Sequence, residues 1–262
     1  MKNKKNKRIA VIGDSFSDEY IYGKVDRVSP EAPVPVLDVT KHEQRGGGAI
    51  NVANNLYSLG IDLTLFTITS MKLPYRVVSP SGSNVLKKIR FIGNNFQLLR
   101  VDEPPVYMKK DLKRMVYPSF NDFDIIVFVD YNKGIIKGGK ATIVDSKKRD
   151  LSVFKGTEYL KINKKEYAEA INKEIFPSAF ITHAEKGINF YEEGEFKLNL
   201  PTQVKEVIDV TGAGDTVMAT IIYCLVNGIM EPKLIMKLAN KAAGIVVAKF
   251  GTATVSEKEL LS

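Results

Sequence analysis

Cysteine, histidine and long uncharged segments are scarce in this sequence. Its single cysteine, Cys224, cannot form an internal disulfide and lies in an apolar run, so we interpret it as a core residue of a protein in a reducing compartment. The two histidines, His42 and His183, lack the spacing of metal ligands. The longest uncharged segments, residues 46–61 and 216–230, are shorter than the roughly 18 residues needed to span a bilayer. These absences predict a cytoplasmic protein that does not cross a membrane.

The net charge of +8 is concentrated at the start of the chain. Five of the 38 basic residues are Lys2, Lys4, Lys5, Lys7 and Arg8. The remaining 33 basic residues face 30 acidic ones, which leaves a net charge of only +3. We therefore expect a solvated tail and no nucleic-acid partner, with a polyanion-binding arm as the alternative. The apolar run that follows, residues 9–12, is too short for the hydrophobic region of a secretion signal.

Strand-like and helix-like patterns alternate along most of the 262 residues. This alternation predicts an α/β fold with a mostly parallel central sheet flanked by helices, in one domain over residues 1–262. We expect buried strands at residues 8–12, 63–68, 124–129, 141–145 and 179–182. We expect helices at residues 49–59, ended by Gly60, and at residues 213–227 and 232–248.

Two segments do not fit the main sheet. Residues 34–39 carry a proline and are typical of an edge strand. Residues 86–91 and 96–101 are typical of a hairpin, because a turn-prone Gly-Asn-Asn sequence joins them. Together the segments at about 15–45 and 86–102 predict a small β-sheet that projects from the domain.

A glycine-rich turn precedes the helix expected at residues 213–227. It reads Val-Thr-Gly-Ala-Gly-Asp over residues 210–215. Glycines let backbone N–H groups approach an anion, and a helix N-terminus adds partial positive charge, so we interpret this turn as a phosphate site. The spacings of a P-loop and of a dinucleotide-binding fingerprint are both absent. Asp215 is the candidate general base for a substrate hydroxyl, and a plain helix N-cap is the alternative.

A second glycine turn, Gly46-Gly47-Gly48, opens the helix expected at residues 49–59, and Asp14 ends the first expected strand. In an open parallel sheet, strand C-termini and helix N-termini share the edge where ligands bind. Asp14 and Asn51 therefore suit hydrogen bonding to the hydroxyl groups of a sugar. A tight turn without a function is the alternative for the three glycines.

Three motifs together resemble a known family. The glycine turn with Asn51, the tetrad Asn163-Lys164-Lys165-Glu166 and the signature Gly212-Ala213-Gly214-Asp215 occur in this order in the ribokinase-like (PfkB) carbohydrate kinases. The sequence is most similar to kinases that phosphorylate D-glycero-β-D-manno-heptose 7-phosphate at O1 on the way to ADP-heptose. The segments that carry this closer resemblance are residues 29–36, 88–90, 97–102, 131–134, 206–216, 240–244 and 251–252.

The resemblance implies a ribokinase-like fold with a β-sheet lid, ATP and Mg²⁺ as cofactors, and a sugar phosphate as the acceptor. It leaves open a monovalent cation near Asp209. The implied site residues are Asp215 as the base; Gly212, Ala213 and Gly214 as the anion hole; Asn163 and Glu166 for Mg²⁺ through water; Asp14, Gly47, Gly48 and Asn51 for the sugar; Thr182, Glu185 and Gly187 beside ATP; and Asn240 and Gly251 near the adenine. Lys88 and Arg90 are implied contacts to a sugar phosphate, with exposed lid charges as the alternative.

The sequence also departs from the heptose kinases. Gly46 and Ser146 stand where those kinases have proline, and Glu19 replaces an arginine. The chain is shorter after Ile68 and over residues 130–141, where relatives carry helices. We therefore expect an uncovered sheet face that a homodimer buries, with the lid edges as a second pairing surface. The alternatives are a kinase for another sugar or sugar phosphate and a non-catalytic sugar-binding pseudokinase; retention of the base favours an enzyme.

Overall fold

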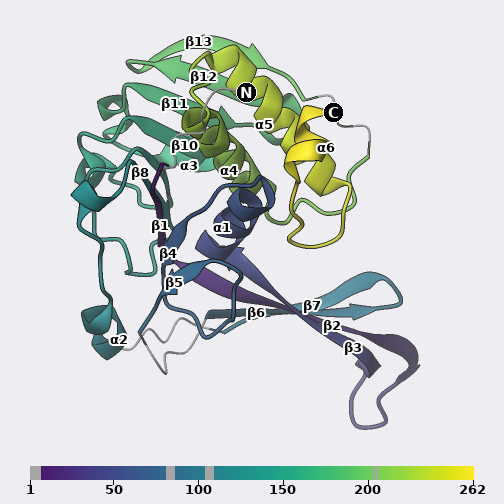
Figure 1. Ribbon diagram of the computed structural model, residues 1–262. Helices are drawn as coiled ribbons and strands as arrows, with labels where there is room; N and C mark the ends of the chain where they lie inside the picture. The colour runs from purple at the N-terminus through teal and green to yellow at the C-terminus, as the bar shows by residue number, and fades with distance from the viewer. Residues whose placement is uncertain (1–6, 81–85, 104–108, 203, 205) are drawn as a thin grey trace.

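The computed structural model describes residues 7–80, 86–103, 109–202, 204 and 206–262 (Figure 1). Lys2, Lys4 and Lys5 of the expected tail lie outside the described residues. The strands of the main sheet are β1 (Ile9–Gly13), β4 (Thr64–Phe66), β5 (Arg76–Val78), β8 (Ile125–Asp130), β9 (Ile143–Ser146), β10 (Tyr159–Asn163), β11 (Ser178–Thr182), β12 (Ile188–Glu192) and β13 (Glu195–Leu200).

Within the described residues this sheet has the order β13-β12-β11-β10-β9-β8-β1-β4-β5. All neighbours from β11 to β5 pair in parallel, and β12 and β13 add an antiparallel edge. Strands β1, β4, β8, β9 and β11 match the five expected strands, with ends that differ by two residues at most. The expected mostly parallel α/β sheet is therefore confirmed. Strand β10 was not expected, because Lys161 interrupts its apolar run.

Three helices cover one face of the main sheet (Figure 1). They are α1 (Ala49–Ser58), α4 (Ala213–Val226) and α5 (Pro232–Val247), and they match the expected helices to within one residue. Alternate strand residues such as Val11 and Val127 point to these helices and form one hydrophobic core with them. Shorter helices are α2 (Lys109–Arg114), α3 (Lys164–Glu169) and α6 (Glu257–Leu261). In the part of the chain that is described, no helix has the length and hydropathy needed to cross a membrane.

Irregular segments of the same chain cover the opposite face of the sheet. Ile126 and Phe128 of β8 point to this face and are 8% and 2% exposed. They belong to a second core cluster with Ile135, Ile136 and Phe154, which lie outside any α-helix. The expected uncovered face is therefore wrong, because the connection between β8 and β9 and the segment around Phe154 cover the sheet without forming an α-helix.

A buried ion pair holds the connection between β8 and β9 in place. Asp130, at the end of β8, accepts a hydrogen bond from Lys148 Nζ at 2.6 Å. The same ammonium group donates to the carbonyl oxygen of Ile136 at 2.8 Å. The Asp130 carboxylate is buried, so the pair is shielded from water. Lys148 thus anchors a loop that has no helical hydrogen bonds of its own.

A second sheet forms the expected lid. Its strands are β2 (Ser15–Val28), β3 (Pro35–Gly48), β6 (Leu86–Gly93) and β7 (Phe96–Asp102), in the order β3-β2-β6-β7. Pro35 begins the edge strand β3, and Asn94 and Asn95 adopt positive φ angles in the turn between β6 and β7. This lid sheet extends away from the main sheet, from the end at which β2 follows β1 (Figure 1).

Candidate active site

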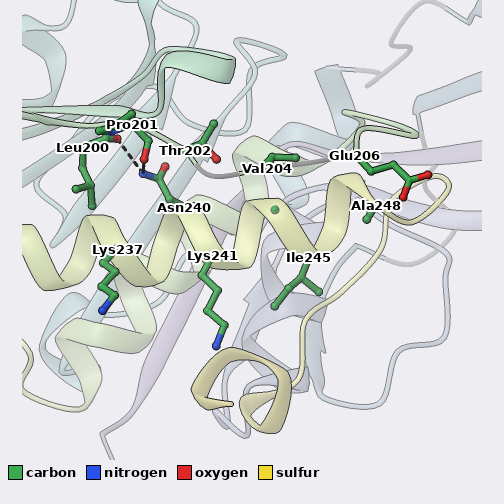
Figure 2. Close-up of a pocket in the computed structure, with 11 residues that line it drawn as sticks. Leu200, Pro201, Thr202, Val204, Glu206, Lys237, Asn240, Lys241, Ile245 and Ala248 are labelled. Carbon is green, nitrogen blue, oxygen red and sulfur yellow. Dashed lines mark hydrogen bonds between the residues drawn. The ribbon is translucent and has the colours of Figure 1, made fainter.

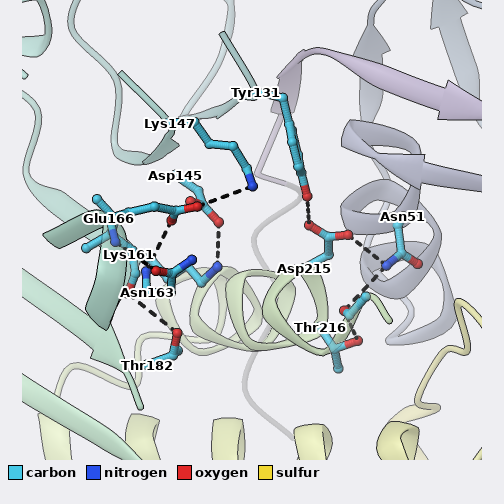
Figure 3. Close-up of polar contacts among 12 residues, drawn as sticks. Asn51, Tyr131, Asp145, Lys147, Lys161, Asn163, Glu166, Thr182, Asp215 and Thr216 are labelled. Carbon is cyan, nitrogen blue, oxygen red and sulfur yellow. Dashed lines mark hydrogen bonds and ion pairs between the residues drawn. The ribbon is translucent and has the colours of Figure 1, made fainter. Parts of the chain in front are cut away.

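Asp215 lies in the first turn of α4, where three elements meet. Its carboxylate is buried, and both oxygens accept hydrogen bonds (Figure 3). Asn51 Nδ2 from α1 donates to Oδ2 at 2.9 Å, and the hydroxyl of Tyr131, which follows β8, donates to Oδ1 at 3.0 Å. Gly212, the N-cap of α4, has a φ of +80° and lies so close to Asn51 that a side chain has no room. The N-termini of α1 and α4, each preceded by a glycine turn, therefore lie close together, as expected.

The environment of Asp215 raises its pKa to about 6. Burial is the largest cause, because desolvation disfavours the charged carboxylate. The hydrogen bonds from Asn51 and Tyr131 lower the pKa and limit this rise. A carboxylate with a pKa near neutral pH is suited to remove a proton from a hydroxyl group.

A directional chain of hydrogen bonds orients Asn51. Thr216 Oγ1 donates to Asn55 Oδ1 at 3.2 Å, and Asn55 Nδ2 donates to Asn51 Oδ1 at 3.3 Å. The amide oxygen of Asn51 is thereby occupied, and its amide nitrogen faces Asp215. The sequence suggested Asn51 as a sugar contact, which stays a prediction; in this structure its amide nitrogen donates to Asp215.

Asn163 and Glu166 form a capping box at the N-terminus of α3. Asn163 Oδ1 accepts the N–H of Glu166 at 2.9 Å, and Glu166 Oε2 accepts the N–H of Asn163 at 3.4 Å. Glu166 Oε1 lies 3.2 Å from Lys147 Nζ. Among the described residues there is no cluster of three or more acidic, histidine or cysteine side chains that could hold a metal ion. This sparse oxygen set fits Mg²⁺, which keeps several waters and binds one or two carboxylates together with substrate phosphates.

A buried lysine that the sequence patterns did not reveal lies beside this group. Lys161 on β10 is 4% exposed, and its Nζ lies 2.5 Å from Asp145 Oδ2 at the end of β9 (Figure 3). The same nitrogen lies 3.1 Å from the position that a Cβ would take at Gly214. The signal in the sequence is a lysine between the apolar residues of a short strand, which is rare unless the charge is paired.

On the side of the lid, Asp14 is fully buried at the end of β1. Its carboxylate accepts the N–H groups of Lys133 at 3.0 Å and Ile135 at 3.4 Å. Burial raises the pKa of Asp14 to about 6. Gly48, with a φ of +61°, packs on its carbonyl oxygen. Asp14 thus anchors the loop after β8, and its contact with a sugar stays a prediction.

The lid sheet contributes a second carboxylate that the sequence did not single out. Asp18 on β2 is 3% exposed, lies against Gly47 and pairs with Arg90 NH1 at 2.6 Å. Arg90 is therefore neutralised inside the lid. Lys88 Nζ lies 3.9 Å from the ring centroid of Phe16, and among the described residues no carboxylate is within ion-pair distance of it. Asp18 was missed because one aspartate in a strand forms no recognisable motif.

A cleft of about 1010 Å³ gathers most of the predicted nucleotide and phosphate residues. Those on its wall are Asn163, Glu166, Thr182, Glu185, Gly187, Gly212, Ala213, Gly214, Asp215 and Asn240. The predicted residues outside its wall are Asp14, Gly47, Gly48, Asn51, Lys88, Arg90 and Gly251. Gly251 donates its N–H to Asp209 at 3.0 Å and packs against Arg45 of the lid. The structure thus places most residues predicted to bind the nucleotide on the wall of the cleft and the residues predicted to bind the sugar outside it. Asp215 lines the cleft and contacts Asn51.

A smaller cavity of about 540 Å³ extends the cleft along α5 (Figure 2). It shares Thr202, Val204 and Asn240 with the cleft, and apolar side chains form much of its wall. Asn240 Nδ2 donates to the carbonyl oxygens of Leu200 at 2.9 Å and Pro201 at 3.3 Å. Asn240 therefore fixes the distance between α5 and the segment that follows β13.

Comparisons with known proteins agree with this arrangement. The family model described as pfkB family carbohydrate kinase matches residues 141–259. The bifunctional protein HldE of Hydrogenovibrio crunogenus is 34% identical over 97% of this chain and 62% of its own length. HldE of Helicobacter pylori strain J99 is 34% identical over 97% of this chain and 65% of its own length. The chain therefore spans less than two thirds of the curated relatives that it matches.

Solved structures show the same fold at low identity. A ribokinase from Thermotoga maritima superposes with a TM-score of 0.71 at 17% identity, over 97% of this chain and 98% of that one. Phosphofructokinase-2 from Escherichia coli gives 0.71 at 15% identity, over 97% of each chain. The fold of the whole chain is therefore that of the ribokinase-like structures. Residues 141–259 match the pfkB family of carbohydrate kinases.

Proposed function

We propose that this protein transfers the γ-phosphoryl group of ATP to a hydroxyl group of a sugar phosphate, at O1 of D-glycero-β-D-manno-heptose 7-phosphate. The observation that carries the proposal is the buried Asp215 carboxylate, held by Asn51 and Tyr131 on the wall of the cleft. Asp215 takes the proton of the acceptor hydroxyl, whose oxygen then bonds to the γ-phosphorus. The bond from that phosphorus to the bridging oxygen breaks, and ADP leaves.

The surroundings of Asp215 supply the charge stabilisation that phosphoryl transfer requires. The backbone of Gly212, Ala213 and Gly214, at the N-terminus of α4, would bind the transferring group. Asn163 and Glu166 would hold Mg²⁺ through water, and the ion would neutralise phosphate charge. Thr182, Glu185 and Gly187 line the cleft where the ATP phosphates and ribose would lie. The adenine would occupy the apolar cavity beside α5, bounded by Asn240.

The heptose phosphate is proposed from the motif resemblance and from the similarity to the HldE proteins. Lys88 supports a phosphorylated acceptor, because burial lowers the pKa of its ammonium group and no carboxylate pairs with it among the described residues. A desolvated cation of this kind gains most from an anionic ligand. The deciding experiment measures ATP consumption across heptose, hexose and pentose phosphates, with mass detection of the product. Turnover of another sugar phosphate alone would replace the heptose, and no turnover at all would support the pseudokinase.

Replacing Lys88 by alanine should raise KM for the phosphorylated sugar by about 10- to 100-fold, because a charge-assisted contact is lost. KM for the unphosphorylated sugar should change little. The control is Lys87→Ala, since Lys87 lies on the same strand, points to the opposite face and pairs with Glu19 at 3.3 Å. Equal changes for both sugars in the Lys88 variant would exclude phosphate recognition by this residue.

The pH dependence of kcat/KM should report the state of Asp215. Its pKa is raised to about 6, so the basic form is lost as the pH falls through this value, and the rate should fall with it. Tyr131→Phe removes a hydrogen bond that lowers this pKa. The acidic limb should therefore move to higher pH. Rate profiles from pH 5 to 8 test this, with the half-exposed Tyr57→Phe as control; an unchanged limb in the Tyr131 variant would contradict it.

We also propose a cytoplasmic homodimer of single kinase domains, paired through the lid sheets. Strand β7 is an edge strand in which Phe96 and Leu99 are 74% and 56% exposed. An edge with exposed apolar side chains is a surface on which a second strand can pair. Light scattering at micromolar concentration tests this, and a mass of 29.2 kDa for the active protein would contradict the dimer.

A further inference from the structure

Lys161 is a buried cation of the cleft that the proposed mechanism has not used. It lies on β10 and lines the cleft together with the glycine turn at the N-terminus of α4. Among the described residues its ammonium group makes one hydrogen bond, to Asp145 Oδ2 at 2.5 Å. An ammonium group has three N–H donors, so two remain for another partner. Because the side chain is 4% exposed and still lines the cleft, those donors can serve only what enters the cleft.

The ammonium group of Lys161 lies beside the N-terminus of α4. Its Nζ would lie 3.1 Å from a Cβ at Gly214, so the ammonium group rests against the second residue of the helix. The N–H of Ala213 donates to Val210 and that of Thr216 donates to Gly212. The N–H groups of Gly214 and Asp215, between them, form no backbone hydrogen bond with described residues. The two N–H groups at the N-terminus of α4 and the ammonium group of Lys161 are therefore close together and available to one ligand in the cleft.

An anionic ligand at this place must bring its own counter-ion, because the carboxylates outnumber the cations named here. Lys161 and Lys147 are the cations beside three carboxylates, Asp145, Glu166 and Asp215 (Figure 3). Lys147 Nζ is held at 3.2 Å from Glu166 and faces the ring of Tyr131 at 4.7 Å. Lys161 instead lies against Gly214, in the turn that would bind the transferring group.

On the basis of the proposed kinase function, we propose that Lys161 is a catalytic residue whose ammonium group binds the γ-phosphoryl group of ATP. It does so together with the free N–H groups of Gly214 and Asp215. As the bridging oxygen leaves with ADP, the ammonium group stays with the transferred phosphoryl group. Asp145 is a positioning residue, which holds the ammonium group against Gly214 and keeps it charged in a buried place.

The test compares ADP with the non-hydrolysable analogue β,γ-imido-ATP, because only the analogue carries the γ-group. Calorimetry in the presence of Mg²⁺ should show that Lys161→Met binds ADP within twofold of the wild type and the analogue at least tenfold more weakly. With a sugar phosphate that the wild type accepts, kcat should fall by about 100-fold or more. The charge control is Lys155→Met, an exposed lysine outside the cleft, which should match the wild type in all three measurements.

Two further variants separate catalysis from folding. Lys161→Met leaves Asp145 buried without a partner, so Lys161→Met/Asp145→Asn removes both charges and restores a neutral, folded site. The double variant should also lose affinity for the analogue and keep affinity for ADP. Asp145→Asn alone keeps the ammonium group and should keep the preference for the analogue. Equal weakening of ADP and analogue in the double variant, or no weakening of either, would overturn the proposal for Lys161.

The same measurements distinguish this proposal from the kinase proposal. A wild-type protein that phosphorylates a sugar, with a Lys161→Met variant of equal kcat and equal affinity for the analogue, refutes only the role of Lys161. A wild-type protein that binds the analogue more tightly than ADP but phosphorylates no sugar refutes the kinase function. In that case the variants still decide whether Lys161 binds the γ-phosphoryl group.

Discussion

Replacing Asp215 by asparagine should leave both substrates bound while kcat falls by about 10² to 10⁴, the usual contribution of a positioned general base. The substitution preserves shape, and the amide oxygen can still accept the hydrogen bond from Asn51. The amide nitrogen can donate to the Tyr131 oxygen, so the buried group stays satisfied. What is lost is the ability to take a proton from the acceptor hydroxyl.

The measurement is kcat at saturating ATP and sugar phosphate, together with the dissociation constants of both ligands. Because the variant has no carboxylate to titrate, its residual rate should not fall through pH 6 as that of the wild type does. The control is Asp62→Asn, an exposed carboxylate in the loop after α1, for which we expect wild-type kinetics. Turnover within threefold of the wild type in the Asp215 variant would remove this residue from the base role.

The glycine turns could be predicted from the sequence because their requirements are local. Gly212 and Gly48 adopt positive φ angles at the N-termini of α4 and α1, and glycine does so at little cost. Once both turns are placed at the same edge of a parallel sheet, their proximity follows from topology. The amino-acid sequence could therefore predict that the two turns lie close together, whereas the roles of Asp215 and Asn51 stay predictions.

Residues that act through distant partners could not be predicted in this way. Lys161 is buried because Asp145 lies 16 residues away on the neighbouring strand, and nothing in the local sequence reports that pairing. Tyr131 reaches Asp215 across 84 residues of chain. Asp18 is held by an ion pair with Arg90, which lies on another strand of the lid. Each of these contacts depends on which strands become neighbours in the sheet. Local sequence patterns determine the order of the strands only loosely.

The prediction that one face of the main sheet is uncovered was wrong for a related reason. The eleven residues 130–140 are at the lower limit of length for a crossover, which predicted that part of a helical layer is missing; the structure has no helix in this segment. Length did not predict that Ile135 and Ile136 would pack on the sheet in an irregular conformation. That conformation needs an anchor for its backbone, and the anchor is the pair of Lys148 with Asp130.

Replacing Lys148 by methionine should therefore destabilise the protein by about 3–5 kcal/mol, the range for breaking a buried ion pair on one side. The Asp130 carboxylate is fully buried, the Lys148 side chain is 18% exposed, and their atoms are 2.6 Å apart. Methionine fills a similar volume but leaves Asp130 without its cation and the Ile136 carbonyl without a donor. The loop should loosen from the sheet as a result.

Urea unfolding of the whole protein measures the change in free energy, and hydrogen exchange over residues 131–140 should show faster exchange in the variant before global unfolding. The matched control is Lys137→Met, an exposed lysine in the same loop, for which we expect a change within about 0.5 kcal/mol. Lys148→Met/Asp130→Asn should recover part of the loss, because no unpaired charge remains. A loss below about 1 kcal/mol in the single variant would mean that apolar packing of Ile135 and Ile136 holds the loop without the ion pair.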